Sequence, residues 1–156
     1  MKKDILVPFD GSRNATEALQ LAITMAKLLQ EKLIVLNVQP SFQTVHTKMF
    51  FKENTIREYQ EQLFEETAAP ARKILDEAGI DYELRLRIGD AKEQICLEAM
   101  AGNTVLPGCA TTGMRMIVMG SRGMHPVLGG VLGSVSYGVV NAAGCPVTIV
   151  PYSCAE

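Results

Sequence analysis

Short apolar segments alternate with helix-patterned segments along most of the chain, and this alternation restricts the fold more than any other feature. We predict strands and helices at the following ranges: strands 5–7, 33–38, 82–88, 116–119 and 146–150, and helices 14–29, 53–78, 90–101 and 133–143. Strands in such a series are joined by right-handed helical crossovers and become parallel neighbours. The sequence therefore predicts a doubly wound α/β fold, a five-stranded parallel sheet of order 3-2-1-4-5 with helices on both faces.

Local signals refine these elements. Either Ser12 or Asn14 caps the first helix, and Asn14 with Glu17 fits a capping box. The 3.6-residue period places seven side chains of this helix inward: Ala15, Ala18, Leu19, Ala22, Ile23, Ala26 and Leu29. The strict alternation of 82–88 is typical of an edge strand, with one face exposed.

The helix 53–78 contains Pro70, which is expected to kink or restart it, and Gly79 ends it. Its predicted inward side chains are Ile56, Tyr59, Leu63, Phe64, Ala71, Ile74 and Leu75. The connection 39–52 is too polar and irregular to assign.

Length and charge restrict the function classes. A chain of 156 residues predicts one domain, residues 1–156. With 15 basic and 17 acidic residues the net charge is −2, and no basic cluster is longer than Lys2-Lys3, so we expect no nucleic-acid partner. The first residues show no signal core, and no stretch approaches a membrane span, so we expect a cytoplasmic protein with no membrane partner.

The cysteines and histidines do not form a metal motif. Four cysteines lack a C-x2-C spacing and only two histidines are present, so no zinc site is expected. Cys96 and Cys145 read as small apolar fillers, whereas Cys109 and Cys154 read as exposed thiols. Disulfides are not expected in a cytoplasmic chain.

Residues 120–134 read G-x2-G-x9-G-S directly after the strand 116–119. Glycines at such a turn permit positive φ and a close approach to a ligand, and the following helix start supplies free N–H donors to an anion. The alternative is that these glycines only permit tight turns and close packing. The chain has no Gly-Lys pair, which excludes a Walker A loop, and one glycine after the first strand does not make a dinucleotide fingerprint.

The predicted strand order places the turn 8–10 beside the loop 120–134, at the point where the order reverses. Asp10 at this edge is either a ligand contact or a cap of the next helix. Arg122 is either a phosphate partner or a solvated charge. His125 reads as a loop residue, because no nearby partner orients it as a base. We expect no catalytic residue and no protein metal site.

Four segments, residues 5–12, 117–123, 133–136 and 145–151, resemble the universal stress protein family, specifically its nucleotide-binding branch, over nearly the whole chain. The resemblance implies an adenine nucleotide alpha hydrolase-like fold and bound ATP, AMP or ADP, with Mg²⁺ or Mn²⁺ held through the phosphates. It implies roles for eleven residues: Gly120, Gly123, Gly133 and Ser134 as the phosphate and ribose cradle, Val135 as a backbone donor, Asp10 at the nucleoside, Pro8, Phe9, Val38 and Met119 around the adenine, and Arg122 as the nearby cation.

Two segments depart from the family pattern. The spacer 124–132 lacks the Lys or Arg that relatives carry, and the loop 102–115 is longer than its counterpart and has no assigned role.

The resemblance implies a stress-response protein that acts through nucleotide-dependent conformation or partner contacts. Slow ATP hydrolysis or autophosphorylation is the enzymatic alternative, and a structural dimer that binds no nucleotide is the third. A response-regulator reading lacks the Lys that should follow the fifth strand, where Pro151 stands. The apolar last strand, Val147–Val150, is expected at an edge, and its pairing with a second copy predicts a homodimer.

Overall fold

The computed structural model describes residues 3–101, 113–123 and 132–153. Its strands and helices follow this order: β1 (Ile5–Pro8), α1 (Arg13–Leu29), β2 (Leu33–Gln39), α2 (Val45–Phe50), α3 (Glu53–Ala78), β3 (Tyr82–Ile88), α4 (Ala91–Met100), β4 (Met116–Gly120), α5 (Ser134–Ala142) and β5 (Val147–Val150). The predicted alternation is confirmed, and α2 is the one described helix that the sequence reading left unassigned.

The strands form one five-stranded sheet of order β3-β2-β1-β4-β5, in which all pairs are parallel. This is the predicted order, and β3 lies at an edge as its alternation indicated. β1 lies between β2 and β4. The connection after β1 leads to β2 on one side, whereas the connection after β4 leads to β5 on the other side. The carboxyl ends of β1 and β4 therefore form the reversal point at which α/β sheets bind ligands.

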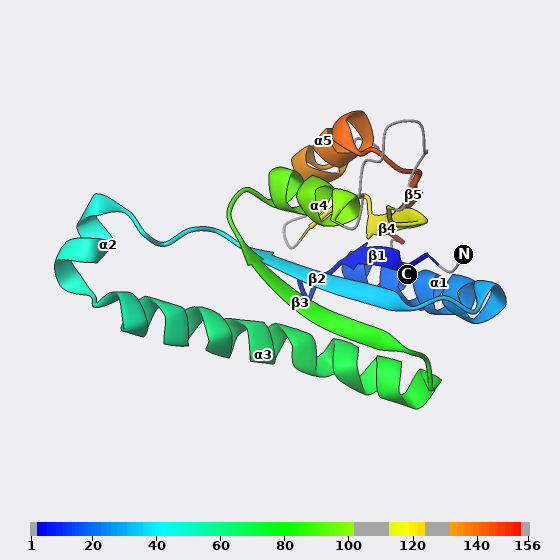
Figure 1. Ribbon diagram of the computed structural model, residues 1–156, viewed down its shortest axis with the longest axis horizontal. Coiled ribbons are helices and arrows are strands. Elements are labelled where there is room, and N and C mark those ends of the chain that lie inside the picture. The colour runs from blue at the N-terminus through cyan, green and yellow to red at the C-terminus, as the bar shows by residue number, and fades with distance from the viewer. Residues whose placement is uncertain (1–2, 102–112, 124–131, 154–156) are drawn as a thin grey trace.

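Helices cover both faces of the sheet: α1 and α3 lie on one side, and α4 and α5 on the other (Figure 1). Alternate residues of the central strands enter the two cores, so that Ile5 and Val7 pack towards α1 while Leu6 packs towards α4. All three side chains are fully buried. Central strands covered on both faces explain the continuous apolar runs in the sequence.

The start of α1 corrects one prediction. Ser12 is the N-cap, and its hydroxyl accepts a hydrogen bond from the Ala15 amide at 3.1 Å. The capping box of Asn14 with Glu17 is wrong, because Asn14 lies inside the helix and is fully buried. Leu29 was also expected inward and is 42% exposed, since α1 ends there and Gln30 turns the chain with a φ of 54°.

α3 is one continuous helix that contains Pro70, so the expected restart at this proline is wrong. Gly79 ends the helix at a φ of 65°, as predicted. The first half of α3 and the short α2 extend beyond the sheet as a projecting arm, residues 45–66 (Figure 1). Tyr59 was predicted inward, but on this arm it has little of the molecule to pack against and is 53% exposed.

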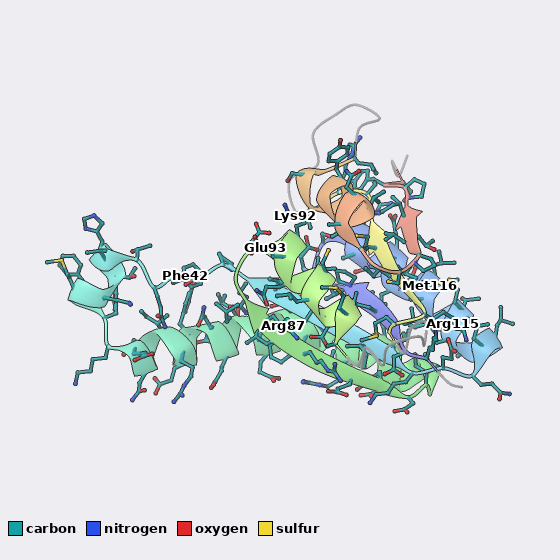
Figure 2. All side chains as sticks on the ribbon, turned by 45° about the horizontal axis from the view of Figure 1, so that its top comes forward. Phe42, Arg87, Lys92, Glu93, Arg115 and Met116 are labelled. Carbon is teal, nitrogen blue, oxygen red and sulfur yellow. The ribbon has the colours of Figure 1, made fainter. Side chains whose placement is uncertain are left out.

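Two buried carboxylates tie peripheral elements to the sheet. Glu98 of α4 is 2% exposed and pairs with Arg85 and Arg87 of β3; Arg87 lies beneath α4 in Figure 2. Burial acts to raise the pKa of Glu98, but the hydrogen bonds from the two arginines outweigh it and hold this pKa below its usual value. Glu31 accepts two hydrogen bonds from the Arg115 guanidinium, just before β4.

Among the described residues, no helix has the length and apolar character needed to span a membrane.

Candidate functional site

The turn after β1 brings one carboxylate to the edge of the sheet. The Phe9 amide donates to the Leu36 carbonyl at 2.8 Å, which extends the pairing of β1 with β2 by one residue. Asp10 follows, exposed, and its Oδ1 accepts from the Ser12 amide at 2.9 Å. Gly11 has a φ of 81°, a backbone conformation that favours glycine. One Asp10 oxygen thus fixes the turn, while the carboxylate stays open to solvent.

The loop after β4 is closed onto the start of α5 by hydrogen bonds to one carbonyl. The Ser121 carbonyl accepts from the Gly133 amide at 2.8 Å and from the Ser136 hydroxyl at 2.8 Å. Ser136 is 2% exposed, and its hydroxyl also lies 3.0 Å from the Gly133 carbonyl. The two ends of the loop, far apart in sequence, are therefore held together at the carboxyl end of β4.

Asn14 connects this loop to the end of β5. Its Oδ1 accepts from the Arg122 amide at 3.0 Å and from the Ser121 hydroxyl at 3.3 Å. Its Nδ2 donates to the Val150 carbonyl at 3.1 Å and to Glu17 at 3.1 Å. The side chain is fully buried, so one amide group links α1, the loop after β4, and β5.

The segment after β5 closes over the same loop. The Tyr152 amide donates to the Ser121 hydroxyl at 3.2 Å, and the Arg13 guanidinium lies 5.9 Å from the Tyr152 ring centre. The Ser153 hydroxyl donates to Glu17, and this bond, with those from Asn14 and the charge of Arg13, holds the pKa of Glu17 below its usual value despite some burial. The last described residues thus buttress the loop from the side of α1.

The glycines of the predicted cradle allow neighbouring segments to approach closely, and they do not adopt positive φ. A Cβ on Gly120 would lie 2.6 Å from Asn14 Oδ1, so this glycine permits the contact of β4 with α1. A Cβ on Gly133 would lie 3.2 Å from the Ser121 carbonyl, and one on Gly123 would lie 3.2 Å from Asp10 Oδ2. None of the three has positive φ, so that part of the prediction is wrong. Gly123 and Asp10 are neighbours, as the strand order predicted.

Among the residues that the structure describes, no group pairs with the first amides of α5, those of Ser134 and Val135. Gly133 is the N-cap residue and has no side chain with which to cap the helix, and the first turn contains no acidic residue. The first amide paired to the helix backbone is that of Tyr137, which donates to the Gly133 carbonyl at 2.9 Å. Ser134 and Val135 in the first turn are exposed. Helix amides in this position are suited to an anionic ligand.

The residues predicted around an adenine ring lie at the same edge, but two have buried side chains. Phe9 is 3% exposed and packs in the core under α1, and Met119 is 5% exposed in the core under α4. Pro8 and Val38 are half-buried. A ligand at this edge can therefore meet Phe9 and Met119 mainly through their backbone.

Several predicted features fall outside the described residues: His125, most of the spacer 124–132, most of the loop 102–115, Cys109 and Cys154. Cys96 is buried and Cys145 half-buried, both as free thiols, which agrees with their reading as apolar fillers. Burial raises the pKa of both thiols. Among residues 3–101, 113–123 and 132–153, no group of three or more metal-ligating side chains is present.

The parallel sheet of order β3-β2-β1-β4-β5, with helices on both faces, defines a doubly wound α/β fold. The chain belongs to the universal stress protein family, because residues 1–151 match the model described as "Universal stress protein family". It is similar to universal stress protein Sll1654 from Synechocystis, with 30% identity over 97% of this chain and 87% of the relative. It is also similar to universal stress protein YxiE from Bacillus subtilis, with 29% identity over 96% and 99%.

Solved structures share the fold. The hypothetical protein MJ0577 superposes with a TM-score of 0.80 at 24% identity, over 99% of both chains. The universal stress protein from Archaeoglobus fulgidus in complex with dAMP gives a TM-score of 0.64 at 21% identity, over 96% of this chain and 97% of the other. The family protein At3g01520 from Arabidopsis thaliana with AMP bound gives 0.65 at 19% identity, over 97% and 93%.

The sequence reading assigned no role at this edge to Asn14, Ser121 and Ser136, which hold the loop together. Asn14 was read as a helix cap, yet it falls four residues before Ala18 on the inward face of α1. A polar side chain on an inward helical face needs buried partners, and this signal could have identified it. The partners of Asn14 in the loop after β4 and at the end of β5 lie more than a hundred residues away and had no signal in the sequence.

Proposed function

We propose that this chain binds an adenine nucleotide at the carboxyl ends of β1 and β4, and that the nucleotide acts in a stress response through conformation or partner contacts. The observation that carries the proposal is the uncapped start of α5, held beside the β4 loop by the Gly133–Ser121 hydrogen bond, with the Asp10 carboxylate next to Gly123. Nucleotide complexes of relatives that share the fold support it.

Each part of a nucleotide has a matching group at this edge. The first-turn amides at Ser134 and Val135 donate to phosphate oxygens, and the helix dipole adds to their attraction. The exposed oxygen of Asp10 accepts from a ribose hydroxyl, which is a charge-assisted bond. The adenine lies against Pro8 and Val38, and backbone groups at Phe9 and Met119 meet its edge.

The positive charge near the loop glycines limits the number of phosphates that the site holds. Arg122, close to Gly123 and Gly133, is the cation that contacts the phosphates. We propose that AMP and ADP compete with ATP, and that ATP requires Mg²⁺ or Mn²⁺ to balance its charge. The ion is held through the phosphates, with no dedicated set of protein ligands.

Calorimetric titration of the dialysed protein with AMP, ADP and ATP–Mg²⁺ tests the proposal. Gly123→Val and Gly133→Val should each abolish binding, because the added side chain enters the space beside Asp10 or the Ser121 carbonyl. Gly144→Val is the matched control, since a Cβ at Gly144 meets no atom within 4 Å and its φ is not positive. The control should keep wild-type affinity.

Two results would contradict the proposed site. Heat released equally by wild type and both variants would place the nucleotide elsewhere, and no binding of any of the three nucleotides by wild type would favour the structural dimer. Circular dichroism of each variant before titration establishes that it is folded.

The route from nucleotide to conformation is the Asn14 amide. A ligand that shifts the loop at Arg122 also shifts the Asn14 side chain, and Asn14 holds the Val150 carbonyl at the end of β5. The state of the loop is thereby coupled to the edge of the sheet that β5 forms. Coupling of this kind is reciprocal, so a change at β5 alters nucleotide affinity by the same factor.

We also propose that β5 pairs with its copy across a twofold axis to form a homodimer. β5 is an uncharged edge strand, and uncovered edges of this kind promote pairing. The carbonyls of Pro146 and Val150 face β4, so the alternation of the strand turns the backbone groups of Val147 and Ile149 outward. The free edge therefore offers two outward N–H groups.

Ile149→Pro should remove the association step that β5 mediates and shift the protein towards smaller assemblies, because it removes an outward N–H without removing a bond to β4. Ile149→Ala is the control: it shortens the side chain but keeps the amide, and should keep the wild-type mass. Light scattering at micromolar concentration distinguishes these outcomes, and a monomeric wild type would defeat the dimer proposal.

A further inference from the structure

The far end of the arm carries an apolar patch that the proposed function does not use. Four of its side chains are more than half exposed: Val45 at 76%, Met49 at 74%, Phe50 at 78% and Phe51 at 56%. A cavity of about 520 Å³ opens beside them and reaches Ile56 of α3. Contiguous exposed apolar groups of this kind mark interaction surfaces.

The arm is anchored firmly enough to present this patch. The Phe42 ring lies 6.0 Å from the Tyr59 ring, between centres, and Figure 2 shows Phe42 beside the arm. Gln39 at the end of β2 donates to the Gln60 carbonyl at 3.0 Å, and both residues are buried. The root of the arm is therefore fixed to the sheet, and its far end projects beyond the sheet (Figure 1).

Charge is divided along the arm. Residues 44–52 contain Lys48 and Lys52 and no carboxylate, residues 53–57 contain one charge of each sign, Glu53 and Arg57, and residues 58–66 contain four glutamates and no Lys or Arg. Both lysines and the first two glutamates of the acidic block, Glu58 and Glu61, are exposed. In the part of the chain that the structure describes, none of these four takes part in an ion pair. The arm thus carries two complementary charge blocks.

We propose that the arm is an interface for a second copy of this chain, in which two arms lie antiparallel about a twofold axis near Thr55. Residues three positions before and after the axis then face each other, so Lys52 meets the partner's Glu58. Residues four positions before and after the axis also face each other, so Phe51 packs on the partner's Tyr59. Each contact occurs twice, as a twofold interface requires.

The outward face of α3 has the spacing that this pairing needs. Thr55, Glu58 and Gln62 follow one another at three- and four-residue intervals and share one side of the helix. All three are exposed, whereas Ile56 and Gln60 face inward. This face of α3 carries the Glu58 carboxylate with the Tyr59 ring beside it. It is complementary to the apolar patch, where Phe51 lies next to Lys52.

A second copy fits this surface better than a lipid bilayer does. An anionic membrane would attract the two lysines but repel the four glutamates of the same arm, of which Glu58 and Glu61 lie about two to three helical turns from Lys52. The partner arm places Glu58 against Lys52 and Tyr59 against Phe51. The interface also leaves β5 free, because β5 lies at the opposite edge of the sheet from β3.

Disulfide trapping on the axis tests the proposal in the full chain. Thr55→Cys should form a cross-linked dimer on mild oxidation, since the axis brings the two copies of this residue together. Glu77→Cys, exposed at the far end of the same helix, is the control and should cross-link no more than the unmodified chain. Equal cross-linking of the two variants, or none at Thr55→Cys, would overturn the proposed axis.

Charge exchange tests the contacts themselves. Lys52→Glu and Glu58→Lys should each weaken one association step in sedimentation by about tenfold, the effect of losing about 1.4 kcal/mol, and an equimolar mixture should recover it. Lys27→Glu, exposed on α1, is the control for a change in net charge. Unchanged association of both variants would contradict the proposal, and so would a mixture that does not recover wild-type association. Binding to anionic vesicles that only Lys52→Glu abolishes would contradict it as well.

Discussion

Replacement of Asn14 by alanine should destabilise the fold by about 2–4 kcal/mol through the loss of its hydrogen bonds. The amide is fully buried and makes hydrogen bonds through both of its ends. Truncation leaves the Arg122 N–H without its acceptor, which costs about 1–3 kcal/mol in a buried position. The lost donor to β5 adds about 1 kcal/mol, because the Val150 carbonyl keeps a second bond from the Ser121 amide at 2.9 Å.

Urea denaturation followed by circular dichroism measures this change at fixed protein concentration. Asn141→Ala is the matched control: Asn141 is also in a helix and its Nδ2 donates to a carbonyl at 2.8 Å, but it is exposed. The control should change stability by less than about 0.5 kcal/mol. Equal midpoints for the two variants would refute the assignment of Asn14 as the link between the loop and β5.

Three further changes test the packing and the ion pairs. Gly120→Ala should cost about 1–3 kcal/mol in chemical denaturation, because the added Cβ meets the Asn14 side chain at 2.6 Å; wild-type stability would contradict the close approach. Glu98→Gln should cost about 3 kcal/mol or more, since it leaves two arginines without their buried carboxylate; a loss below about 1 kcal/mol would contradict this pairing. The Arg85 and Lys32 side chains hold the pKa of Glu83 at about 2. The contribution of Glu83 to stability is therefore complete above about pH 4.5 and is lost as the pH falls towards 2. Glu83→Gln should reduce the fall in the free energy of unfolding between pH 4.5 and pH 2, and an unchanged fall would contradict the shift.

The strand order could be predicted from the sequence because each local signal agreed with the overall fold. The apolar runs around Ile5 and Leu33 and the stop at Gly79 all coincide with elements of the structure. A parallel sheet buried on both faces leaves few arrangements for such a series. The edge position of β3 followed from its alternation for the same reason.

The interior of the site could be predicted only in part. The strand order placed Gly123 beside Asp10, because it fixes which turns are neighbours. It could not identify the contacts of Asn14 with Ser121 and Arg122, since these depend on the packing of α1 against β4. Gly120 illustrates the same limit: the pattern marked it as part of a cradle, and the structure adds a contact with α1.

The arm was missed because its sequence lacks the periodic signal that reveals a buried helix. α2 has six residues and no buried side chain, so no apolar period can develop. Its start depends on Thr44 and Thr47, which cap each other locally. Tyr59 was misplaced for a related reason: the period of α3 continues past the edge of the sheet, where no core remains to receive it.

The central claim, an adenine nucleotide on the first amides of α5, is tested most directly by chemical-shift mapping. Titration of isotopically labelled protein with AMP should move the backbone amide signals of Gly123, Ser134 and Val135 more than any in α3. Saturation of these shifts should give the same affinity as calorimetry. Shifts confined to the arm, or an unchanged spectrum at millimolar AMP, would contradict the account.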